Sequence, residues 1–473
     1  MADSYLALPL QLVGTMIMSR LLTPVETGIF AVAAVFASFA STFRDFGVAE
    51  YLIQEKELTE EKIRAALSVN IAISWAMGLL LFFGSVPVAD FYRSPGVAEV
   101  MRVQAFSFLL IPFGAVTMAH FRRELDFRPI FMASLLANIT TFVVATVCAL
   151  RGLGYMSLAW SSLAGVIVTV GVSLWFRPAG FPRWPGAKGI ADVLHFGKFA
   201  SAIYLIGQLG RGAPEMIIGR AQDMASVALF SRASGLVELF NRTVLRSIAP
   251  ICLPYFAKND REQGSMVHGY LLSISYVTVI GWPFLAFIGL IAYSAIRIIY
   301  GAQWMAAVSL AQILCVAGAI ELIHCFSKEA LMAGGHVKRS NTLQLGSQLC
   351  RVVGLLMVIP YGLLGAAWGL LAAAICNQAY SQWQLSRALG LTIADVMTSC
   401  AKSAYIAALT VIPVAVAASI ESPSEANYLW FALAGGSITS VLWLLALKMF
   451  GHPLWDELAK MTQQIVSKFL KRT

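Results

Sequence analysis

Runs of about 20 consecutive apolar residues recur along almost the whole chain, and this pattern limits the folds open to it. Each run is long enough to cross the ~30 Å hydrocarbon layer of a bilayer as one helix. Hydrophobic residues make up 58% of the chain and charged residues 12%, about half the ~25% charged residues of an average soluble protein. The sequence therefore predicts an all-α membrane protein with many transmembrane helices.

We expect about fourteen transmembrane helices from these runs. The first half supplies 4–19, 28–49, 66–88, 99–120, 129–150 and 154–176. The second half supplies 196–219, 224–254, 268–296, 304–327, 339–360 and 362–386, and two more, 400–419 and 427–449, follow. Pro9 stands within the short first span, so the completeness of that helix stays open.

The two halves of the chain share a sequence repeat. A shift of 208 residues lays eight residues of the first half on identical residues of the second, namely Gly154, Ala159, Trp160, Leu163, Ala164, Ile167, Ser173 and Trp175 on Gly362, Ala367, Trp368, Leu371, Ala372, Ile375, Ser381 and Trp383. The same shift pairs Tyr92 with Tyr300, and a shift of 200 pairs Met16 and Arg20 with Met216 and Arg220. A repeat of six helices keeps both halves in one orientation, so we expect two pseudo-symmetric six-helix bundles in a parallel repeat, an arrangement typical of transporters.

This pattern divides the chain into five parts. We expect an N-terminal bundle over 1–177, a cytoplasmic linker rich in Pro and Gly over 178–195, and a C-terminal bundle over 196–386. Two additional transmembrane helices occupy 399–449, and an amphipathic cytoplasmic tail helix occupies 453–471. Its apolar side carries Trp455, Leu458, Met461, Ile465 and Phe469, which predicts that the tail lies on the anionic inner leaflet.

The loop charges predict the orientation. Lys and Arg concentrate in alternate loops and in the tail, so both termini are expected in the cytoplasm. The net charge of +9 is then explained by the cytoplasmic rim, and no nucleic-acid partner is expected. No cleavable signal peptide is expected. The seven cysteines form no CxxC pair, so neither a metal site nor a disulfide framework is expected.

Charged residues inside the spans carry the chemical information, because an ionisable group in the membrane tends to face protein or a water-filled cavity. On a helix over 224–254, Arg232, Arg242 and Arg246 fall within an arc of about 80°. Guanidinium groups bind phosphate through two oxygens at once, so this face predicts a binding surface for a long anionic ligand. The alternative is that Arg242 and Arg246 only reach toward the inner surface, with Glu238 neutralising one of them.

Two helices carry candidates for ion coupling. Arg211 and Glu215 are four residues apart, which suits either a structural ion pair or a coupling site. We expect Arg211 to contribute to the substrate-binding cavity and Glu215 to be the coupling candidate. Glu321 and His324 share a face, and a histidine that titrates near neutrality suits proton transfer. The alternative for the second pair is hydrogen bonding to neighbouring helices.

Amides and another arginine complete the predicted substrate surface. Gln348 and Arg351 share a face of the helix over 339–360, and Asn377 lies on the next helix. Such groups suit a glycan, although Asn and Gln also hold membrane helices together.

Three loop segments point to a family. Ser19–Gly28, which reads SRLLTPVETG, resembles the "ARLLTPEEFG" signature that follows the first helix of bacterial polysaccharide transporters. The segments Phe43–Gly47 with Leu52–Thr59, and Leu125–Arg128, are similar to that family's "DFG…ALIQ…ELTEE" and "L.FR" stretches. The chain is identified as a member of the oligosaccharide flippase family within the multidrug/oligosaccharidyl-lipid/polysaccharide exporter superfamily.

The resemblance implies a function. Such proteins move undecaprenyl-diphosphate-linked oligosaccharide repeat units from the inner to the outer leaflet of the bacterial inner membrane, for export of exopolysaccharide, capsule or O-antigen. It implies alternating access, coupling to H⁺ or Na⁺, no cofactor, and contacts with membrane lipids and other polysaccharide assembly proteins. No GxxxxGK[ST] loop is present, which disfavours direct ATP hydrolysis. The alternatives are a multidrug/cation antiporter and, as an enzyme, a membrane-embedded polymerase or ligase, for which no nucleophile–base arrangement stands out.

Overall fold

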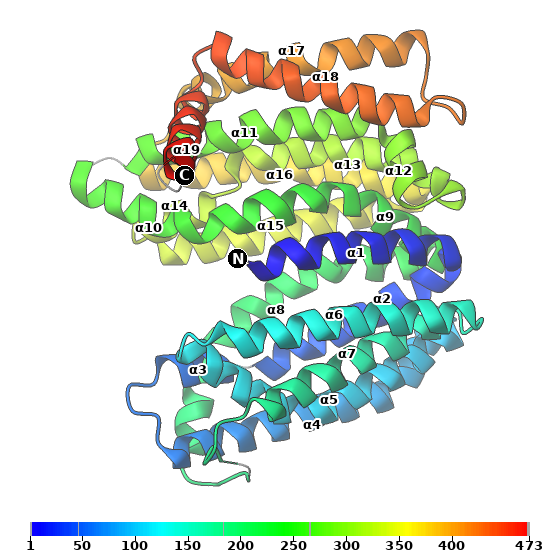
Figure 1. The fold of residues 1–473 in the computed structure, drawn as a ribbon, viewed down its shortest axis with the longest axis vertical. Coiled ribbons are helices and arrows are strands. Elements are labelled where there is room, and N and C mark those ends of the chain that lie inside the picture. Colours follow the sequence, from blue (N-terminus) through cyan, green and yellow to red (C-terminus); the bar gives the residue numbers. More distant parts are fainter. Residues whose placement is uncertain (1, 46, 183, 264–265, 471–473) are drawn as a thin grey trace. The chain divides into compact units, whose positions relative to one another are not determined.

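The computed structural model describes residues 2–45, 47–182, 184–263 and 266–470, and no strand occurs among them. Figure 1 shows helices throughout. They are α1 (Ala2–Leu21), α2 (Pro24–Asp45), α3 (Val48–Gln54), α4 (Glu60–Tyr92), α5 (Pro95–Arg123), α6 (Phe127–Leu150), α7 (Met156–Trp175), α8 (Ile190–Ala221), α9 (Met224–Phe240), α10 (Arg246–Gln263), α11 (Met266–Leu290), α12 (Ala292–Ile299), α13 (Val308–Glu321), α14 (Ser327–Ala333), α15 (Val337–Val358), α16 (Gly362–Leu389), α17 (Ile393–Ile420), α18 (Tyr428–Met449) and α19 (Pro453–Leu470). The all-α class predicted from the sequence is confirmed.

The chain divides into two compact units. Unit 1 comprises 1–231 and 299–303, and unit 2 comprises 232–298 and 304–473. Unit 1 therefore contains the first-half helices together with α8 and the beginning of α9. The five-part division expected from the sequence stays a prediction.

Ten helical runs in the described part of the chain are long and apolar enough to cross a membrane. The expected spans 339–360 and 362–386 fall in one of these runs, Val337–Leu389, which joins α15 to α16 through a 3-10 turn at Ile359–Tyr361. The expected spans 4–19, 196–219 and 224–254 are helical but are not among the ten. The count of fourteen and the pseudo-symmetry stay predictions.

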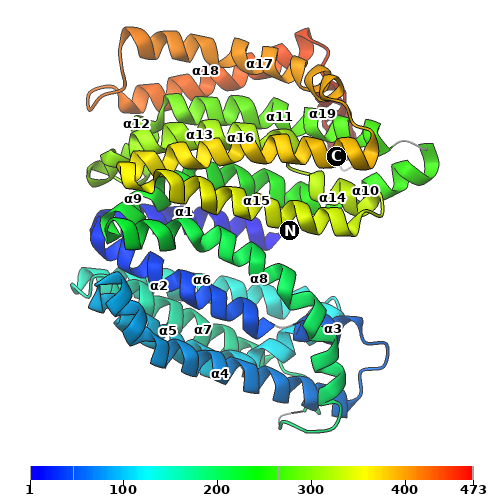
Figure 2. The ribbon, with the colours of Figure 1, turned by 180° about the vertical axis from the view of Figure 1, so that it is seen from behind.

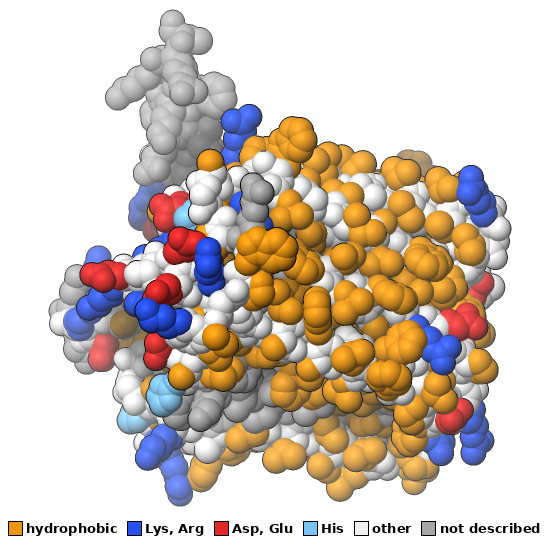
Figure 3. Space-filling view, turned by 90° about the horizontal axis from the view of Figure 1, so that it is seen from below, with side chains coloured by type: hydrophobic (Ala, Val, Ile, Leu, Met, Phe, Trp, Pro, Cys, Tyr) orange, Lys and Arg blue, Asp and Glu red, His pale blue; other side chains and the backbone are white. Residues whose placement is uncertain are grey.

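Large apolar side chains are exposed along these helices. On α4, Leu79, Leu80 and Phe83 are exposed, the last by 70%. Figure 3 shows a face on which hydrophobic side chains cover a wide central area, while charged side chains gather toward two opposite ends. Exposed apolar side chains of this extent are costly in water and favourable in lipid. The protein is a multi-pass membrane protein.

In unit 1, α4 packs on α5, α6 on α7, and α5 on α7. The second-half helix α8 lies beside α2 and α4, as Figure 2 shows. Gly28 of α2 makes the closest approach, because a Cβ placed there would lie 1.7 Å from the carbonyl oxygen of Met224 at the start of α9. The Tyr92 hydroxyl donates to the Met216 carbonyl at 3.2 Å. Unit 1 thus ties helices of both halves of the sequence together.

The loop motifs of the sequence are helix starts. Thr23 precedes α2, and the Glu26 carboxylate accepts from its backbone N–H at 2.8 Å while the Thr23 hydroxyl accepts from the Glu26 N–H at 3.3 Å. This reciprocal pair, with Pro24 between, is a capping box that satisfies the first free N–H groups of the helix. Thr392 and Asp395 form the same arrangement at α17.

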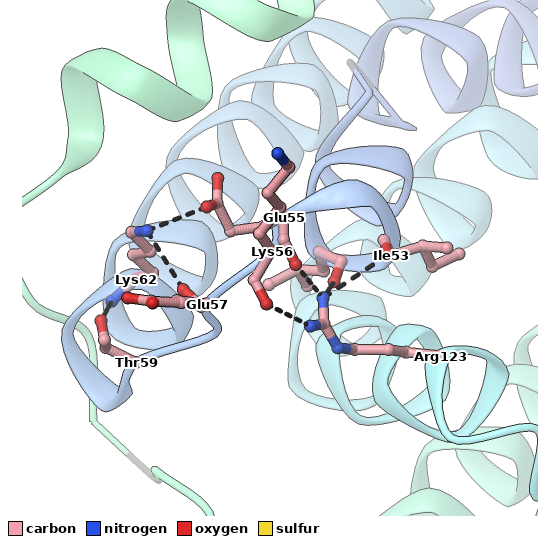
Figure 4. Close-up of polar contacts among 8 residues, drawn as sticks. Ile53, Glu55, Lys56, Glu57, Thr59, Lys62 and Arg123 are labelled. Carbon is pink, nitrogen blue, oxygen red and sulfur yellow. Dashed lines mark hydrogen bonds and ion pairs between the residues drawn. The ribbon is translucent and has the colours of Figure 1, made fainter.

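The segment between α3 and α4 is held by Arg123 at the end of α5 (Figure 4). The Arg123 guanidinium donates to the carbonyl oxygens of Leu52 at 2.8 Å, Glu55 at 2.5 Å and Lys56 at 3.3 Å. Because α3 ends there, its last carbonyls lack helical partners, and the guanidinium supplies the donors. Lys62 donates to the Glu55 carboxylate at 2.9 Å and lowers the pKa of that carboxyl.

Unit 2 has its core around α11. This helix packs on α13 and α17, and α15 packs on α16. Phe256, Tyr270 and Phe326 are among its fully buried side chains and belong to one cluster of buried apolar residues. Burial of each such aromatic ring removes roughly 150–250 Å² from solvent or lipid.

The tail helix α19 is attached to unit 2 by His452, which is fully buried. Its Nδ1 accepts from the Leu454 N–H at 3.2 Å, so Nε2 carries the proton and donates to the Ser275 hydroxyl at 2.9 Å. Leu454, Trp455 and Leu458 pack against a cluster that includes Val279, Ile406 and Leu447. The side chains of Met461, Ile465 and Phe469 lie outside the described residues. The first turns of the tail therefore bury their apolar side against the protein.

We predict that this attachment weakens in acid. Burial first, and the nearby Lys402 second, lower the pKa of His452 to about 4, against about 6.5 in a solvated chain. The neutral form therefore stabilises the attached tail fully above pH 6.5, and this contribution is lost as the pH falls from 6.5 toward 4. Hydrogen–deuterium exchange of 453–460, corrected for intrinsic rates, should rise between pH 7.5 and pH 5.

His452→Gln is the control for this experiment, because an amide keeps a donor and an acceptor but does not titrate. Its exchange should change little with pH. Equal pH responses in the two proteins would contradict the assignment.

Candidate functional site

The predicted arginine surface lies on a helical run that changes its winding. A π-helical turn, Asn241–Leu245, separates α9 from α10. Glu238, one turn before it, forms ion pairs with Arg242 at 3.3 Å and with Arg246 at 2.6 Å. Glu238 therefore pairs with two arginines, where the sequence predicted that it neutralises one. Both guanidiniums remain more than 40% exposed, so each keeps donors for another anion.

Arg232, in the middle of α9, is positioned by an aromatic ring. Its guanidinium lies over the fully buried Trp304 ring, 5.0 Å from the ring centroid. A cation over the face of an indole is stabilised by about 0.5–2 kcal/mol. Sequence reasoning missed this contact, because the two residues are far apart in the chain.

The structure brings together one substrate candidate and one coupling candidate. The Arg351 guanidinium on α15 and the Glu321 carboxylate at the end of α13 form an ion pair at 3.1 Å. The two side chains are 33% and 39% exposed. The pair therefore joins two helices of unit 2 while staying accessible.

His324, the second coupling candidate on that stretch, takes a different partner. It is buried, and its Nδ1 lies 2.9 Å from the Tyr270 hydroxyl on α11, with the two rings stacked at 10°. The helix tightens into a 3-10 turn at Leu322–His324. Glu321 and His324 nevertheless take partners on different helices, Arg351 on α15 and Tyr270 on α11. The His324 contact fits the alternative of hydrogen bonding to a neighbouring helix.

The predicted amides lie on α15 and α16. Asn377 accepts a hydrogen bond from the Ser347 hydroxyl, which joins the two helices. The amide oxygens of Gln344 and Gln348 are buried and find no hydrogen-bond partner in the described part of the chain. A buried acceptor without a donor is costly, so these oxygens are available to a polar ligand.

Arg211 and Glu215, the candidates on α8, lie in unit 1. The Arg211 guanidinium donates to the Gln208 amide oxygen at 2.8 Å, and the Gln208 amide donates to the Ser38 hydroxyl on α2. Arg211 is exposed, and Glu215 is half-buried. The predicted binding residues are therefore distributed over both units, and each unit holds its own polar set.

An apolar groove of about 440 Å³ lies in unit 2. Its wall is formed by α11, α13 and α17, and α17 contributes Ala404, Ala407, Ala408 and Ala415. Ile320 and Ile323, which flank Glu321, also line it. The small side chains of α17 keep the groove open and make it suited to a hydrocarbon chain.

The chain is similar in sequence to curated proteins of polysaccharide biosynthesis and transport. The chain is 23% identical to the teichuronic acid biosynthesis protein TuaB of Bacillus subtilis, over 87% of this chain and 86% of the relative. It is 23% identical to the lipopolysaccharide biosynthesis protein WzxC of Escherichia coli, over 69% and 67%. It is 26% identical to the succinoglycan biosynthesis transport protein ExoT of Rhizobium meliloti, over 62% and 60%.

Solved structures show the same fold. The lipid II flippase MurJ, in an inward closed conformation, matches with a TM-score of 0.77 and 14% identity over 96% of this chain and 98% of that one. An inward-facing multidrug resistance transporter of the MATE family matches with a TM-score of 0.61 and 16% identity, over 80% and 93%. The family inferred from the loop motifs is confirmed by a profile described as "Polysaccharide biosynthesis protein", which matches residues 17–309. The chain belongs to this polysaccharide biosynthesis family.

Proposed function

We propose that this protein moves undecaprenyl-diphosphate-linked oligosaccharide repeat units from the inner to the outer leaflet of the bacterial inner membrane. Transport proceeds by alternating access, with no covalent bond made or broken, and both termini lie in the cytoplasm. The names of the relatives, which concern teichuronic acid, lipopolysaccharide and succinoglycan, support a glycan precursor as cargo.

The observation that carries the proposal is the charge of the run 224–254. It holds three arginines and one carboxylate, Glu238, and that carboxylate is shared by Arg242 and Arg246. The run therefore carries a net positive charge. This charge lies on guanidinium groups, whose planar donors fit phosphate oxygens. A diphosphate that leaves the headgroup layer loses its hydration, and these donors would replace it.

The main alternative, a multidrug/cation antiporter, requires the opposite charge. A cationic drug is stabilised by carboxylates, whereas arginines outnumber carboxylates on the run 224–254. The likeness to the MATE transporter is one of fold, and a fold does not determine the substrate. The flippase is therefore the better supported function.

The apolar groove of unit 2 can bind the lipid part of the cargo. A polyprenyl chain is a long hydrocarbon, and the groove beside Glu321 is lined by apolar side chains alone. We propose that part of the prenyl chain lies there while the diphosphate is held by arginine.

Ion coupling supplies the energy in this proposal. Glu215 and Glu321 are the candidate carboxylates for coupling to H⁺ or Na⁺, and Glu321 is paired with Arg351. Protonation of Glu321 would release the guanidinium, so the pair offers a means of linking proton binding to anion binding. His324 is the weaker candidate, because its ring is buried against Tyr270.

The proposal is tested by the leaflet distribution of the lipid-linked repeat unit. In cells without the protein, the glycan should accumulate where a membrane-impermeant oxidant of sugar diols does not reach it, and re-expression should restore the labelling. Unchanged labelling in a strain without a redundant flippase would reject the proposal, and an altered drug accumulation in the same strain would favour the antiporter.

Arg351→Gln should lower flipping at least tenfold, because the loss of a charged hydrogen-bond partner is worth about 1.5–3 kcal/mol. The double variant Glu321→Arg with Arg351→Glu restores the ion pair but moves the cation to α13. Flipping in reconstituted vesicles should stay low in both variants, since the diphosphate requires the cation on α15.

Arg387→Gln is the matched control. Arg387 lies near the end of α16, is exposed, and stacks over Trp383 at 4.5 Å. If the charge-swapped variant flips the substrate as fast as the wild type, the Arg351–Glu321 ion pair has only a structural role.

Ala408→Trp should fill the groove and lower flipping of a long-chain prenyl substrate more than that of a short-chain analogue. Ala417→Trp is the control, because Ala417 is exposed on the same helix and does not line the groove. Both variants should insert into the membrane as the wild type does. An equal effect of the two substitutions, or none, would remove the groove from the transport path.

A further inference from the structure

A second cavity, of about 430 Å³, lies in unit 1 between the turn that joins α4 to α5 and the turn that joins α8 to α9. We propose that it is a binding site for an oxyanion, either a carboxylate or a phosphate. The site is separate from the residues of unit 2 assigned to the diphosphate, and the inference does not depend on flipping.

Two guanidiniums line this cavity. Arg93 and Arg220 are both exposed, and neither has a carboxylate within ion-pair distance among the described residues. The Arg220 guanidinium is positioned over the Phe91 ring, 5.0 Å from the centroid. The cavity has one carboxylate, Asp223, against these two guanidiniums, and its Oδ1 accepts from the Ser226 N–H at 2.7 Å at the start of α9.

Two further features suit a ligand. The amide nitrogen of Gln222 is buried and has no hydrogen-bond partner in the part of the chain that the structure describes. The backbone of Arg93 is left-handed, with φ 52° and ψ 38°, a conformation that costs energy in a residue with a Cβ. An unsatisfied donor and a strained arginine in one cavity are typical of a functional site.

The repeat supplies a comparison within the same unit. The shifts of 200 and 208 residues pair Arg220 with Arg20, Gln222 with Leu22, and position 95 with position 303. At this second location Gln303 donates to the carbonyl oxygens of Ser19 and Leu22, the latter at 3.0 Å. That location is therefore closed by a side chain of the protein.

In the cavity, no side chain at the matching position closes the space as Gln303 closes the other location. Pro95 stands where Gln303 stands in the other copy and has no amide to donate. Gln222 replaces Leu22 and adds a donor in place of an apolar side chain. The Tyr92 hydroxyl is already bound to the Met216 carbonyl. The cavity is therefore left open and holds more donors than acceptors, which is the requirement for an oxyanion.

Two sources offer this chemistry: an acidic sugar of a glycan and the phosphate of a membrane lipid headgroup. The planar donors of arginine bind both the carboxylate of such a sugar and the phosphate of a headgroup. The volume is within the range of small-molecule sites and admits one sugar ring or one headgroup.

Binding is tested on the purified full-length protein. In detergent, calorimetric titration with glucuronate and with inorganic phosphate reports the soluble anions, and glucose is the neutral reference. In nanodiscs, native mass spectrometry compares retention of phosphatidylglycerol with that of phosphatidylcholine. Saturable glucuronate binding indicates an acidic sugar, and selective phosphatidylglycerol retention without it indicates a lipid headgroup.

Arg220→Gln should weaken the binding at least tenfold, because a charge-assisted contact becomes a neutral one. Arg151→Gln is the matched control, since Arg151 is exposed beyond the end of α6 and does not line the cavity. Gln222→Leu installs the residue of the other repeat copy and should also weaken the binding.

If the Arg220→Gln protein does not fold, the Gln222→Leu variant still tests whether this cavity binds the anion. The inference is overturned if the wild type binds none of the anions, or if the Arg220→Gln or Gln222→Leu protein binds as the control does.

Discussion

The hydrocarbon core of a bilayer offers no hydrogen-bond partner, and this constraint governs the rest of the structure. Every regular element in the described residues is helical because a helix pairs its own backbone groups. Only the helix ends need partners beyond their own backbone, and side chains of the protein supply them. The capping box of Thr23 and Glu26 serves α2, and Arg123 serves the last carbonyls of α3. The loop motifs that identify the family therefore supply hydrogen-bond partners at helix termini.

The same constraint places the charges. Arg232 is stabilised by the Trp304 ring, Arg242 and Arg246 by Glu238, and Arg351 by Glu321. An ion pair of one carboxylate and one guanidinium has no net charge. Glu238 is shared by two guanidiniums, those of Arg242 and Arg246, so this group keeps a net positive charge. The helices of unit 2 thus hold arginine in ordered positions without neutralising all of it.

The helical class and the family could be predicted from the sequence, because apolar length and capping motifs are local signals. The partners of the site residues could not. Glu321 and Arg351 are 30 residues apart, and Trp304 is no nearer to Arg232, so helical spacing says nothing of either contact. Glu321 and His324 are three residues apart, but they contact Arg351 on α15 and Tyr270 on α11, and helical spacing does not predict these partners. The repeat pairs Arg220 with Arg20, but no sequence pattern relates Arg220 to Arg93 in the cavity of unit 1.

The π-helical turn at Asn241–Leu245 bears on how a duplicated chain diverges. The offset between matched residues is 200 at Met16 and 208 at Tyr92, so the second copy is longer between 233 and 300 than its counterpart. A π turn closes its hydrogen bonds over one more residue than an α turn, so it absorbs an inserted residue without breaking the helix. It also rotates every later side chain to a new direction. A change of length in one half of the chain thereby becomes a change of the surface that the helix presents.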